Sequence, residues 1–247
     1  MDSLSSRRHW LQRALAAAGS LALSACDRLA NSQSVTSTLD AEETWTKHAQ
    51  RWLLGRDALA PEFSEKDISR EAKSNGTSDP DTDDYNRLAQ AGFAGWHLQV
   101  GGLVARPLHL SLEDLRSMPS RTQITRHDCV EGWSYIAKWK GARLSTLLRR
   151  AGISPRARYI VFYCADTLEI TLDGTGQYYE SIDLIDAMHP QTILAYEMND
   201  RPLPIPYGAP LRLRLERQLG YKMAKYIMRI DAVESFKGIS RGSGGFW

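Results

Sequence analysis

The chain has 247 residues, 43% of them hydrophobic, with 31 lysines and arginines against 29 aspartates and glutamates and only three cysteines. This length fits one large domain or two small ones, and three cysteines are too few for a disulfide framework, so each is considered as an individual thiol. The formal net charge of +2 comes entirely from the first 25 residues, so the composition gives no support for a nucleic-acid partner.

The chain begins with a predicted export signal over residues 1–25. The run Ser6-Arg7-Arg8-His9-Trp10-Leu11 resembles the twin-arginine pattern, whose export route carries proteins that are already folded. Ala14 to Ala25 is uncharged and apolar or small, and it is too short to span a bilayer as a helix.

The signal ends in a predicted lipid-attachment site. Leu23-Ser24-Ala25-Cys26 resembles a bacterial lipobox, in which the cysteine thiol takes a diacylglycerol and becomes the first residue of the mature chain. Asp27 resembles the signal that retains lipoproteins at the inner membrane of Gram-negative cells. We therefore expect a periplasmic protein anchored to the inner membrane by its lipid. The alternative is a soluble secreted protein whose signal happens to end near a cysteine.

Residues 26–84 are expected to form a linker and an irregular N-terminal segment. Asp27 to Asp40 is rich in polar residues and predicts a flexible tether. Trp45 and Trp52 share helical spacing within Glu42–Leu54, which predicts a short amphipathic helix with its aromatic side chains in a core. Ser64 to Asp84 carries turn signals and predicts a long irregular wrap over the main domain.

Strands and short helices then alternate through residues 85–235, before a glycine-rich tail over 236–247. The predicted strands are Trp96–Val100 with a hairpin return at Leu103-Val104, Thr122–Arg126, Tyr159–Ala165, Leu168–Leu172, Thr192–Met198, Leu211–Leu215 and Tyr226–Val233. The predicted helices are one capped by Ser111 and Asp114, one from Leu144 to a stop at Gly152, and Ser181–Met188. Local antiparallel pairs mixed with short helices favour an α+β fold with mixed sheets.

The candidate chemistry concentrates around Cys129, where a predicted strand gives way to a loop. Arg126 and His127 precede this cysteine, and a neighbouring cation and imidazole favour the reactive thiolate. The alternative is a buried, inert cysteine, since free cysteine is among the most buried residue types. No phosphate loop, dinucleotide fingerprint, serine nucleophile elbow or paired-cysteine zinc signature is present. The demanding chemistry is therefore expected to belong to a bound cofactor.

Several ordered motifs resemble the sulfite oxidase family of molybdopterin enzymes, and in particular its bacterial periplasmic, methionine-sulfoxide-reducing branch. They are Cys129-Val130-Glu131-Gly132-Trp133-Ser134, Trp139-Lys140-Gly141-Ala142-Arg143-Leu144, His189-Pro190-Gln191-Thr192, Gly208-Ala209-Pro210-Leu211-Arg212 and Gly220-Tyr221-Lys222-Met223-Ala224-Lys225. The resemblance runs from about Tyr85 to Val233. It implies a sulfite-oxidase-type molybdopterin-binding fold over 85–235, with Cys129 as the one protein ligand of molybdenum.

The resemblance also implies a set of cofactor-binding residues besides Cys129. They are Asn86, Ala89, Gln90, Cys164, Tyr207, Arg212, Met223, Ala224 and Lys225. Cys164 stands where the periplasmic branch has threonine, and Tyr207 replaces the usual histidine or asparagine. Arg212 and Lys225 match residues that hold the pterin phosphate, and charge-assisted donors of this kind suit a buried phosphate. The alternative for both is a surface cation.

The implied reaction is the transfer of an oxygen atom to or from a small, sulfoxide- or sulfite-like substrate. Molybdenum would be held by two pterin dithiolene sulfurs, the Cys129 thiolate and oxo ligands, and soft sulfur ligation suits such a metal. Cys129, His127 and Tyr207 are the predicted catalytic residues, with Asp128 and Glu131 as further candidates for the substrate face.

Two departures from the family qualify the substrate and the electron supply. Arg126 is the only arginine directly beside Cys129, which disfavours sulfite as the substrate. No Cys-x-x-Cys-His haem motif is present, so electrons are expected to pass through a separate partner, either a membrane haem protein or a soluble cytochrome. Two other classes stay open: a zinc or copper enzyme that uses His127, Asp128 and Cys129, and a cofactor-free lipoprotein binding module.

Overall fold

The structure is a computed structural model that describes residues 57–168, 176–239 and 242–245, with isolated positions between 32 and 55. The chain divides into two compact units, Met1–Ala58 and Leu59–Trp247. The predicted export signal, Cys26 and most of the tether lie outside the described residues. None of the helices formed by the described residues is long and apolar enough to cross a membrane.

The described positions within the predicted amphipathic helix are helical. Trp45 and Trp52 are among them, and their side chains are 77% and 84% exposed. The helix prediction is therefore correct at these positions, whereas the expectation that its aromatic side chains enter a core is wrong.

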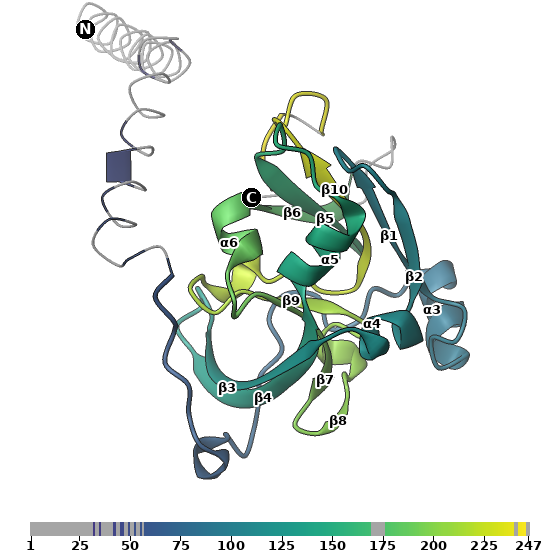
Figure 1. Cartoon of the computed structure of the whole chain (residues 1–247). Helices are drawn as coiled ribbons and strands as arrows, with labels where there is room; N and C mark the ends of the chain where they lie inside the picture. Colours follow the sequence, from purple (N-terminus) through teal and green to yellow (C-terminus); the bar gives the residue numbers. More distant parts are fainter. Residues whose placement is uncertain are drawn as a thin grey trace, which may run out of the picture. The chain divides into compact units, whose positions relative to one another are not determined.

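The second unit contains two sheets of mixed and antiparallel strands (Figure 1). The first sheet has the order β2-β1-β10-β5-β6 and consists of β1 (His97–Gly102), β2 (Leu108–Ser111), β5 (Tyr159–Thr167), β6 (Gln177–Asp183) and β10 (Ile227–Val233). Only the β1–β10 pair in this sheet is parallel.

The second sheet is built on one long hairpin. Its strands are β3 (Ser120–Asp128), β4 (Ser134–Arg143), β7 (Ile193–Met198) and β8 (Arg201–Pro202), in the order β3-β4-β7-β8, and β9 (Arg212–Arg214) pairs with β7. The β3–β4 ladder pairs His127 with Tyr135 and Asp128 with Ser134. The hairpin turn between them therefore carries Cys129.

Short helices connect and cover the strands. They are η1 (Glu65–Asp67), α3 (Asp83–Gln90), α4 (Leu112–Ser117), α5 (Leu144–Ala151), α6 (Leu184–Met188), η2 (Ile205–Tyr207) and η3 (Gly220–Lys222). Figure 1 shows α5 and α6 beside the first sheet, and α6 contacts β5 and β6. The predicted α+β class with mixed sheets and short helices is confirmed.

Two helix boundaries show why the local predictions succeeded. The Ser111 hydroxyl accepts from the Asp114 N–H at 3.1 Å, while the Ser111 N–H donates to the Asp114 carboxylate at 2.8 Å, so α4 begins with a complete capping box. Gly152 ends α5 at φ +69°, a left-handed conformation that favours glycine.

Two local predictions were wrong in detail, and a third is not tested. The strand that returns to β1 is Leu108–Ser111, because Leu103 and Val104 pair elsewhere, Val104 with Ile153. Asp183 caps α6 by accepting from the Asp186 N–H at 3.0 Å, whereas Ser181 is still part of β6. The strand predicted over Leu168–Leu172 lies largely outside the described residues and stays a prediction, while β5 pairs with β6 and β10.

An extended segment over residues 59–82, here called the strap, crosses the second unit. Its Phe63 N–H donates to the Ile124 carbonyl at 2.8 Å, and its Ser69 N–H donates to the Ile136 carbonyl at 3.0 Å. The predicted irregular wrap is therefore part of the compact unit, which begins at Leu59.

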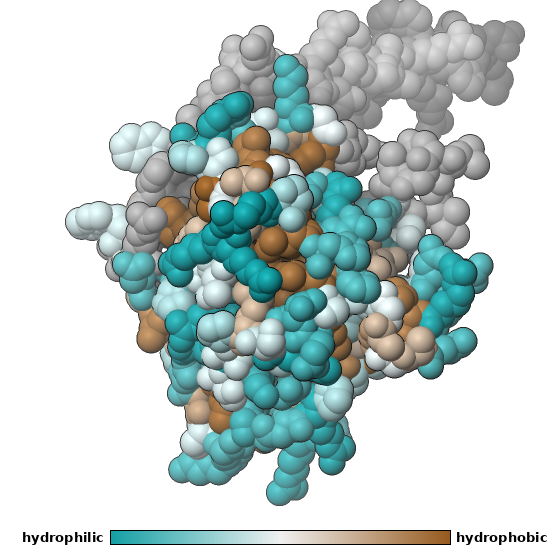
Figure 2. All heavy atoms as spheres, turned by 45° about the vertical axis from the view of Figure 1, so that its right-hand side comes forward, coloured by the Kyte–Doolittle hydropathy of each residue, from teal (hydrophilic) through white to brown (hydrophobic). Residues whose placement is uncertain are grey.

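The larger hydrophobic core contains buried residues from the first sheet, α4, α5 and β9. A smaller core lies beside Trp139 on the second sheet. On the face in Figure 2, hydrophobic residues gather near the centre and hydrophilic residues surround them.

Candidate functional site

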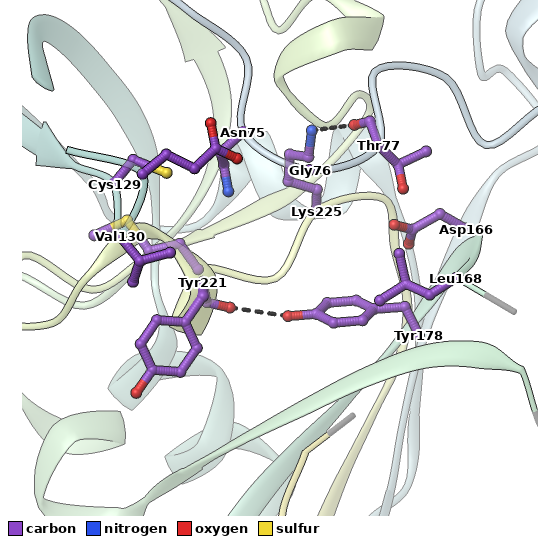
Figure 3. Close-up of a pocket in the computed structure, with 12 residues that line it drawn as sticks. Asn75, Gly76, Thr77, Cys129, Val130, Asp166, Leu168, Tyr178, Tyr221 and Lys225 are labelled. Atoms are coloured by element: carbon purple, nitrogen blue, oxygen red, sulfur yellow. Dashed lines mark hydrogen bonds between the residues drawn. The ribbon is translucent and has the colours of Figure 1, made fainter. Parts of the chain in front are cut away.

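A pocket of about 570 Å³, counted with its mouth to solvent, lies between the strap, the β3–β4 turn, the end of β5 and the segment around η3. Its lining is shown in Figure 3 and consists of Asn75, Gly76, Thr77, Cys129, Val130, Glu131, Asp166, Leu168, Tyr178, Tyr221, Met223 and Lys225. The lining combines apolar and aromatic side chains with a few polar groups, including a thiol and an ammonium, which is typical of a site for a cofactor or small substrate. Three predicted cofactor-binding residues, Cys129, Met223 and Lys225, therefore share one cavity.

Cys129 is held in the pocket by the tight β3–β4 turn. Its N–H donates to the Trp133 carbonyl at 3.0 Å, and its carbonyl accepts from the Gly132 N–H at 3.1 Å. Gly132 has φ +83°, which favours glycine at this position. Cys129 is 8% exposed and lines the pocket, so little of its side chain meets solvent.

The residues around Cys129 divide between the pocket and the surface. Glu131 lines the pocket, and its carboxylate accepts from the Trp133 indole N–H at 2.9 Å. Arg126 instead pairs with Asp128 at 2.9 Å, and both side chains are more than 40% exposed. Neither residue of this pair lines the pocket.

His127 belongs to a buried network behind the turn and does not line the pocket. Its Nδ1 lies 2.9 Å from Nη1 of Arg214, and its Nε2 has no hydrogen-bond partner. Burial and the nearby cations Arg214, Arg212 and Lys225 hold the pKa of His127 far below its usual range. The imidazole is therefore neutral, and because an arginine only donates, the proton lies on Nε2.

Arg212 and Arg214 are completely buried, so the surface-cation alternative is wrong for Arg212. Arg214 makes a bidentate pair with Glu216, with distances of 3.0 and 2.6 Å. Arg212 has no such partner: its Nη1 donates to the Tyr207 carbonyl at 3.0 Å, while Nε and Nη2 make no hydrogen bond. Both guanidinium groups lie over the Trp139 ring. Arg212 therefore keeps two buried donors available for an anion.

Lys225 is the second buried cation without a carboxylate bond. It is 5% exposed, and its ammonium donates to the Ser74 hydroxyl at 3.2 Å, to the Pro206 carbonyl at 3.0 Å and to the Thr77 carbonyl. Burial, with a smaller effect of Arg212, lowers the pKa of Lys225 to about 7. An anion near this ammonium would restore its charge.

Gly208 brings the two cations close together. A Cβ at this glycine would lie 2.9 Å from the Lys225 Cβ and 3.2 Å from the Arg212 Cβ, and its φ is +108°. Only a glycine fits between the two side chains in this conformation. The arrangement forms a positively charged site that suits a phosphate.

The remaining predicted residues lie around this site without lining the pocket. Asn86, Ala89 and Gln90 are on α3, which is attached through the Tyr85 hydroxyl to the Ala209 carbonyl at 2.7 Å. Tyr207 presents its carbonyl to Arg212, and its hydroxyl donates to the Ala72 carbonyl at 2.7 Å.

Cys164 and Ala224 are buried next to the pocket. Cys164 is 0% exposed, and burial raises the pKa of its thiol well above the usual value. The Ala224 carbonyl accepts from the Leu213 N–H at 2.8 Å, which joins the η3 segment to β9. The roles of these residues toward a cofactor stay predictions.

Sequence reasoning missed the contribution of the strap and of β5 to the pocket. Asn75, Gly76 and Thr77 were recognised only as part of a turn-rich segment, although they line the cavity with Cys129. Asp166 was also missed. The available signal was a lone acidic residue directly after the buried run Tyr159–Ala165.

The residues described by the structure contain no group of three or more histidine, cysteine or acidic side chains that could hold a metal ion. Asp128 pairs with Arg126 and His127 with Arg214, so neither side chain joins Cys129. The geometry therefore does not support the zinc or copper alternative built on these three neighbours.

Comparison with known families gives a match over residues 86–238 to the family described as "Oxidoreductase molybdopterin binding domain". Among solved structures, the sulfane dehydrogenase SoxCD from Paracoccus pantotrophus is similar, with a TM-score of 0.50 and 20% identity over 72% of this chain and 46% of that chain. This likeness concerns the fold alone.

Curated relatives are more similar in sequence. A protein of Azospira oryzae, provisionally named protein-methionine-sulfoxide reductase subunit YedZ1, is 36% identical over 99% of this chain and 85% of its own length. The protein-methionine-sulfoxide reductase catalytic subunit MsrP of Xanthomonas axonopodis pv. citri is 37% identical over 56% of this chain. The MsrP of Campylobacter jejuni is 33% identical over 55% of this chain. The chain spans slightly less than half the length of each MsrP, 45% and 48%.

Proposed function

Because this chain belongs to the oxidoreductase molybdopterin-binding domain family and is therefore a molybdopterin-dependent oxidoreductase, we propose that it reduces sulfoxides by oxygen-atom transfer. The observation that carries the proposal is that Cys129 and Lys225 line one pocket, with the unpaired Arg212 guanidinium next to Lys225.

The residues present fit the cofactor that the family implies. Cys129 offers a thiol, the soft ligand expected for molybdenum, at one part of the cavity. The two free donors of Arg212 and the Lys225 ammonium suit the pterin phosphate, because buried donors without partners carry a desolvation cost that an anion removes. The family membership and this fit favour a molybdoenzyme over the cofactor-free binding module.

When bound, the molybdenum cofactor supplies a metal that exchanges two electrons and an oxygen atom with the substrate. The chain's own residues would hold and orient two parts of this cofactor, its phosphate and its metal. Arg212 and Lys225 would hold the phosphate, and Cys129 would hold the metal. Val130, which is 61% exposed, and Glu131 border the pocket beside Cys129, where a substrate would approach.

Methionine sulfoxide is the substrate that the relatives favour. The Azospira protein and both MsrP proteins are named for protein-methionine-sulfoxide reduction. Reduction of a sulfoxide to a sulfide consumes two electrons and two protons and releases water. The electrons must come from a separate protein partner, which we propose to be a membrane haem protein or a soluble cytochrome.

We also propose that the protein works in the periplasm, anchored to the inner membrane through Cys26. The support is the sequence of the first 27 residues, with its twin arginines and lipobox. A Cys26→Ser variant is expected to move from the membrane fraction to the soluble periplasmic fraction. A variant that stays in the membrane fraction would contradict the lipid anchor.

The function is tested with protein purified from its own periplasm and a dye-linked reductase assay across sulfoxides, N-oxides and sulfite. We expect stoichiometric molybdenum and pterin, and reduction of methionine sulfoxide in preference to the other substrates. Cys129→Ala should abolish this activity, while Ser134→Ala, an exposed change at the same turn, should retain it. Stoichiometric zinc, no metal, or full activity of Cys129→Ala would contradict the proposal.

A further inference from the structure

Two tryptophans of the first unit are exposed on one side of its helical segment. Trp45 and Trp52 are 77% and 84% exposed, and Ala49 between them is exposed as well. All three positions are helical, and spacings of this kind place residues on one side of a helix. We call the surface formed by Trp45, Ala49 and Trp52 the tryptophan face. Single exposed apolar side chains are ordinary, but two tryptophans exposed together indicate a surface that binds a partner.

The sequence around the tryptophan face suits an anionic lipid surface. Lys47, Arg51 and Arg56 lie between or soon after the two tryptophans, and no acidic residue occurs from Trp45 to Arg56. Helices that carry tryptophan on one face and lysine or arginine elsewhere are typical of segments that lie in the plane of a bilayer interface. Tryptophan favours this interface because its ring is apolar while its indole N–H keeps a polar partner there.

The proposed lipid anchor would keep the tryptophan face close to a bilayer. About 20 residues separate Cys26 from Trp45, and a flexible chain of about that length spans roughly 25 Å on average. Such a tether raises the local concentration of the helix at the membrane surface, so a weak intrinsic affinity for lipid is enough for it to bind. A phospholipid surface is therefore the partner that both the composition of the segment and its place in the chain favour.

We propose that the tryptophan face docks onto the phospholipid surface of the membrane that holds the anchor. Trp45 and Trp52 enter the headgroup region, and the nearby cations interact with lipid phosphates. The second unit begins at Leu59, soon after Trp52, so docking holds the start of the catalytic unit at the bilayer. The inference rests on the proposed lipid anchor, because a short interfacial helix by itself binds only weakly and reversibly.

The test measures binding to protein-free vesicles in the absence of the lipid anchor. The Cys26→Ser protein, purified from the periplasm, is sedimented with vesicles of phosphatidylethanolamine and phosphatidylglycerol at increasing lipid concentration. Trp45→Ala combined with Trp52→Ala in this background removes both rings, and alanine maintains the helix propensity. Thr46→Ala is the matched control, because Thr46 is exposed on the same helix and has no aromatic ring. Mass spectrometry of the wild-type protein determines separately whether Cys26 carries lipid.

We expect the Cys26→Ser protein to bind these vesicles reversibly, and the double tryptophan variant to need at least about tenfold more lipid for half-maximal binding. Thr46→Ala should bind like its Cys26→Ser parent. Vesicles should shift the tryptophan fluorescence of the parent to shorter wavelength and leave that of the double variant unchanged. Because the binding is reversible, the Cys26→Ser protein still leaves washed membranes, as expected for loss of the anchor.

Other results would separate the docking surface from the anchor. Absence of vesicle binding by the Cys26→Ser protein, or equal binding with and without the two tryptophans, would overturn the docking surface and leave the proposed anchor intact. A wild-type protein without lipid on Cys26 would instead refute the anchor, while the vesicle measurement would still decide the role of Trp45 and Trp52.

Discussion

Two buried arginines, Arg212 and Arg214, differ in whether a carboxylate neutralises their charge. Arg214 is neutralised by Glu216, and both side chains are 0% exposed. Arg212 is equally buried but has only the Tyr207 carbonyl and the Trp139 ring. A buried charge without a counterion is costly. The buried charge of Arg212 therefore destabilises the cofactor-free protein, and a bound anion would remove this electrostatic cost.

Exchanging each arginine for methionine should have opposite effects on stability. Arg212→Met should stabilise the cofactor-free chain by about 1–4 kcal/mol, because it replaces an unpaired buried charge with an apolar group. Arg214→Met should destabilise it by about 3–5 kcal/mol, because the buried carboxylate of Glu216 loses its charged partner and keeps only the Gln123 amide. Denaturant unfolding of both variants measures the difference. Destabilisation of the cofactor-free chain by Arg212→Met would contradict an uncompensated charge at this position.

Lys225 gives the cofactor-free protein a predictable pH dependence. Its pKa is lowered from 10.5 to about 7 in the folded state, mainly by burial. Between these values the unfolded chain binds more protons, so this group makes the folded state more stable as pH rises, by at most about 1.4 kcal/mol per pH unit. Below pH 7 both states are protonated and the contribution is constant.

The Lys225→Met variant isolates this contribution. Its gain in unfolding free energy over the wild type should be largest below pH 7 and should shrink as pH rises toward 10. Denaturant unfolding across this pH range checks the result. Parallel stability curves for the two proteins would show that Lys225 does not titrate in this window.

At the residue scale, the sequence predicted the pocket residues that belong to compact motifs. Cys129, Met223 and Lys225 lie in such motifs and meet in the cavity. Asp166 and Thr77 could not be placed, because their positions depend on how β5 and the strap pack around Lys225. His127 was a reasonable neighbour for Cys129 in sequence, but strand alternation turns its side chain into the core behind the turn.

At the element scale, η3 is positioned by direct contact with the β3 strand. A Cβ at Gly220 would lie 2.5 Å from Nε2 of His127, so no larger residue fits without a shift. Tyr221 and Met223, which line the pocket, follow directly. The close approach of η3 to β3 therefore sets the part of the pocket wall that Tyr221 and Met223 form.

Gly220→Ala should displace η3 and weaken cofactor retention. We expect a loss of about 1–3 kcal/mol in unfolding free energy, as for other overpacked sites. Gly95→Ala is the matched control, because a Cβ there meets nothing within 4 Å, and its effect should stay within about 0.5 kcal/mol. Equal stabilities and equal pterin contents of the two variants would argue against this packing.

Element types were predictable where the signal is local. The capping box at Ser111 and the stop at Gly152 are satisfied within one turn of chain, and both helices appear as expected. The return strand of β1 was misplaced because Gly102 packs against the Ala232 backbone of β10 instead of forming a tight hairpin. The parallel partner strand β10 is distant in sequence, so the residues near β1 give no local signal of this pairing.

At the scale of the whole molecule, the strap completes the site. The Thr77 carbonyl accepts from both Lys225 and the Tyr226 hydroxyl, and the Ala72 carbonyl accepts from Tyr207. The family match begins at residue 86, after the strap. The motif-bearing region alone therefore lacks one wall of its own pocket.

A chain that begins at Leu59 and one that begins at Tyr85 test this conclusion. The longer chain should unfold at the same temperature as the full chain and retain pterin. The shorter chain should be destabilised and should lose pterin, because the ammonium of Lys225 loses two of its acceptors, on Ser74 and Thr77. Equal thermal midpoints and pterin contents for the two chains would show that the strap is dispensable.

The most direct test of the account is X-ray absorption at the molybdenum edge of the purified holoprotein and its Cys129→Ser variant. We expect stoichiometric molybdenum in the wild type, and one fewer sulfur neighbour of the metal in the variant, with the pterin still held by the buried cations. An unchanged number of sulfur neighbours in Cys129→Ser, or a wild-type protein without molybdenum, would contradict the assignment of Cys129 as the metal ligand.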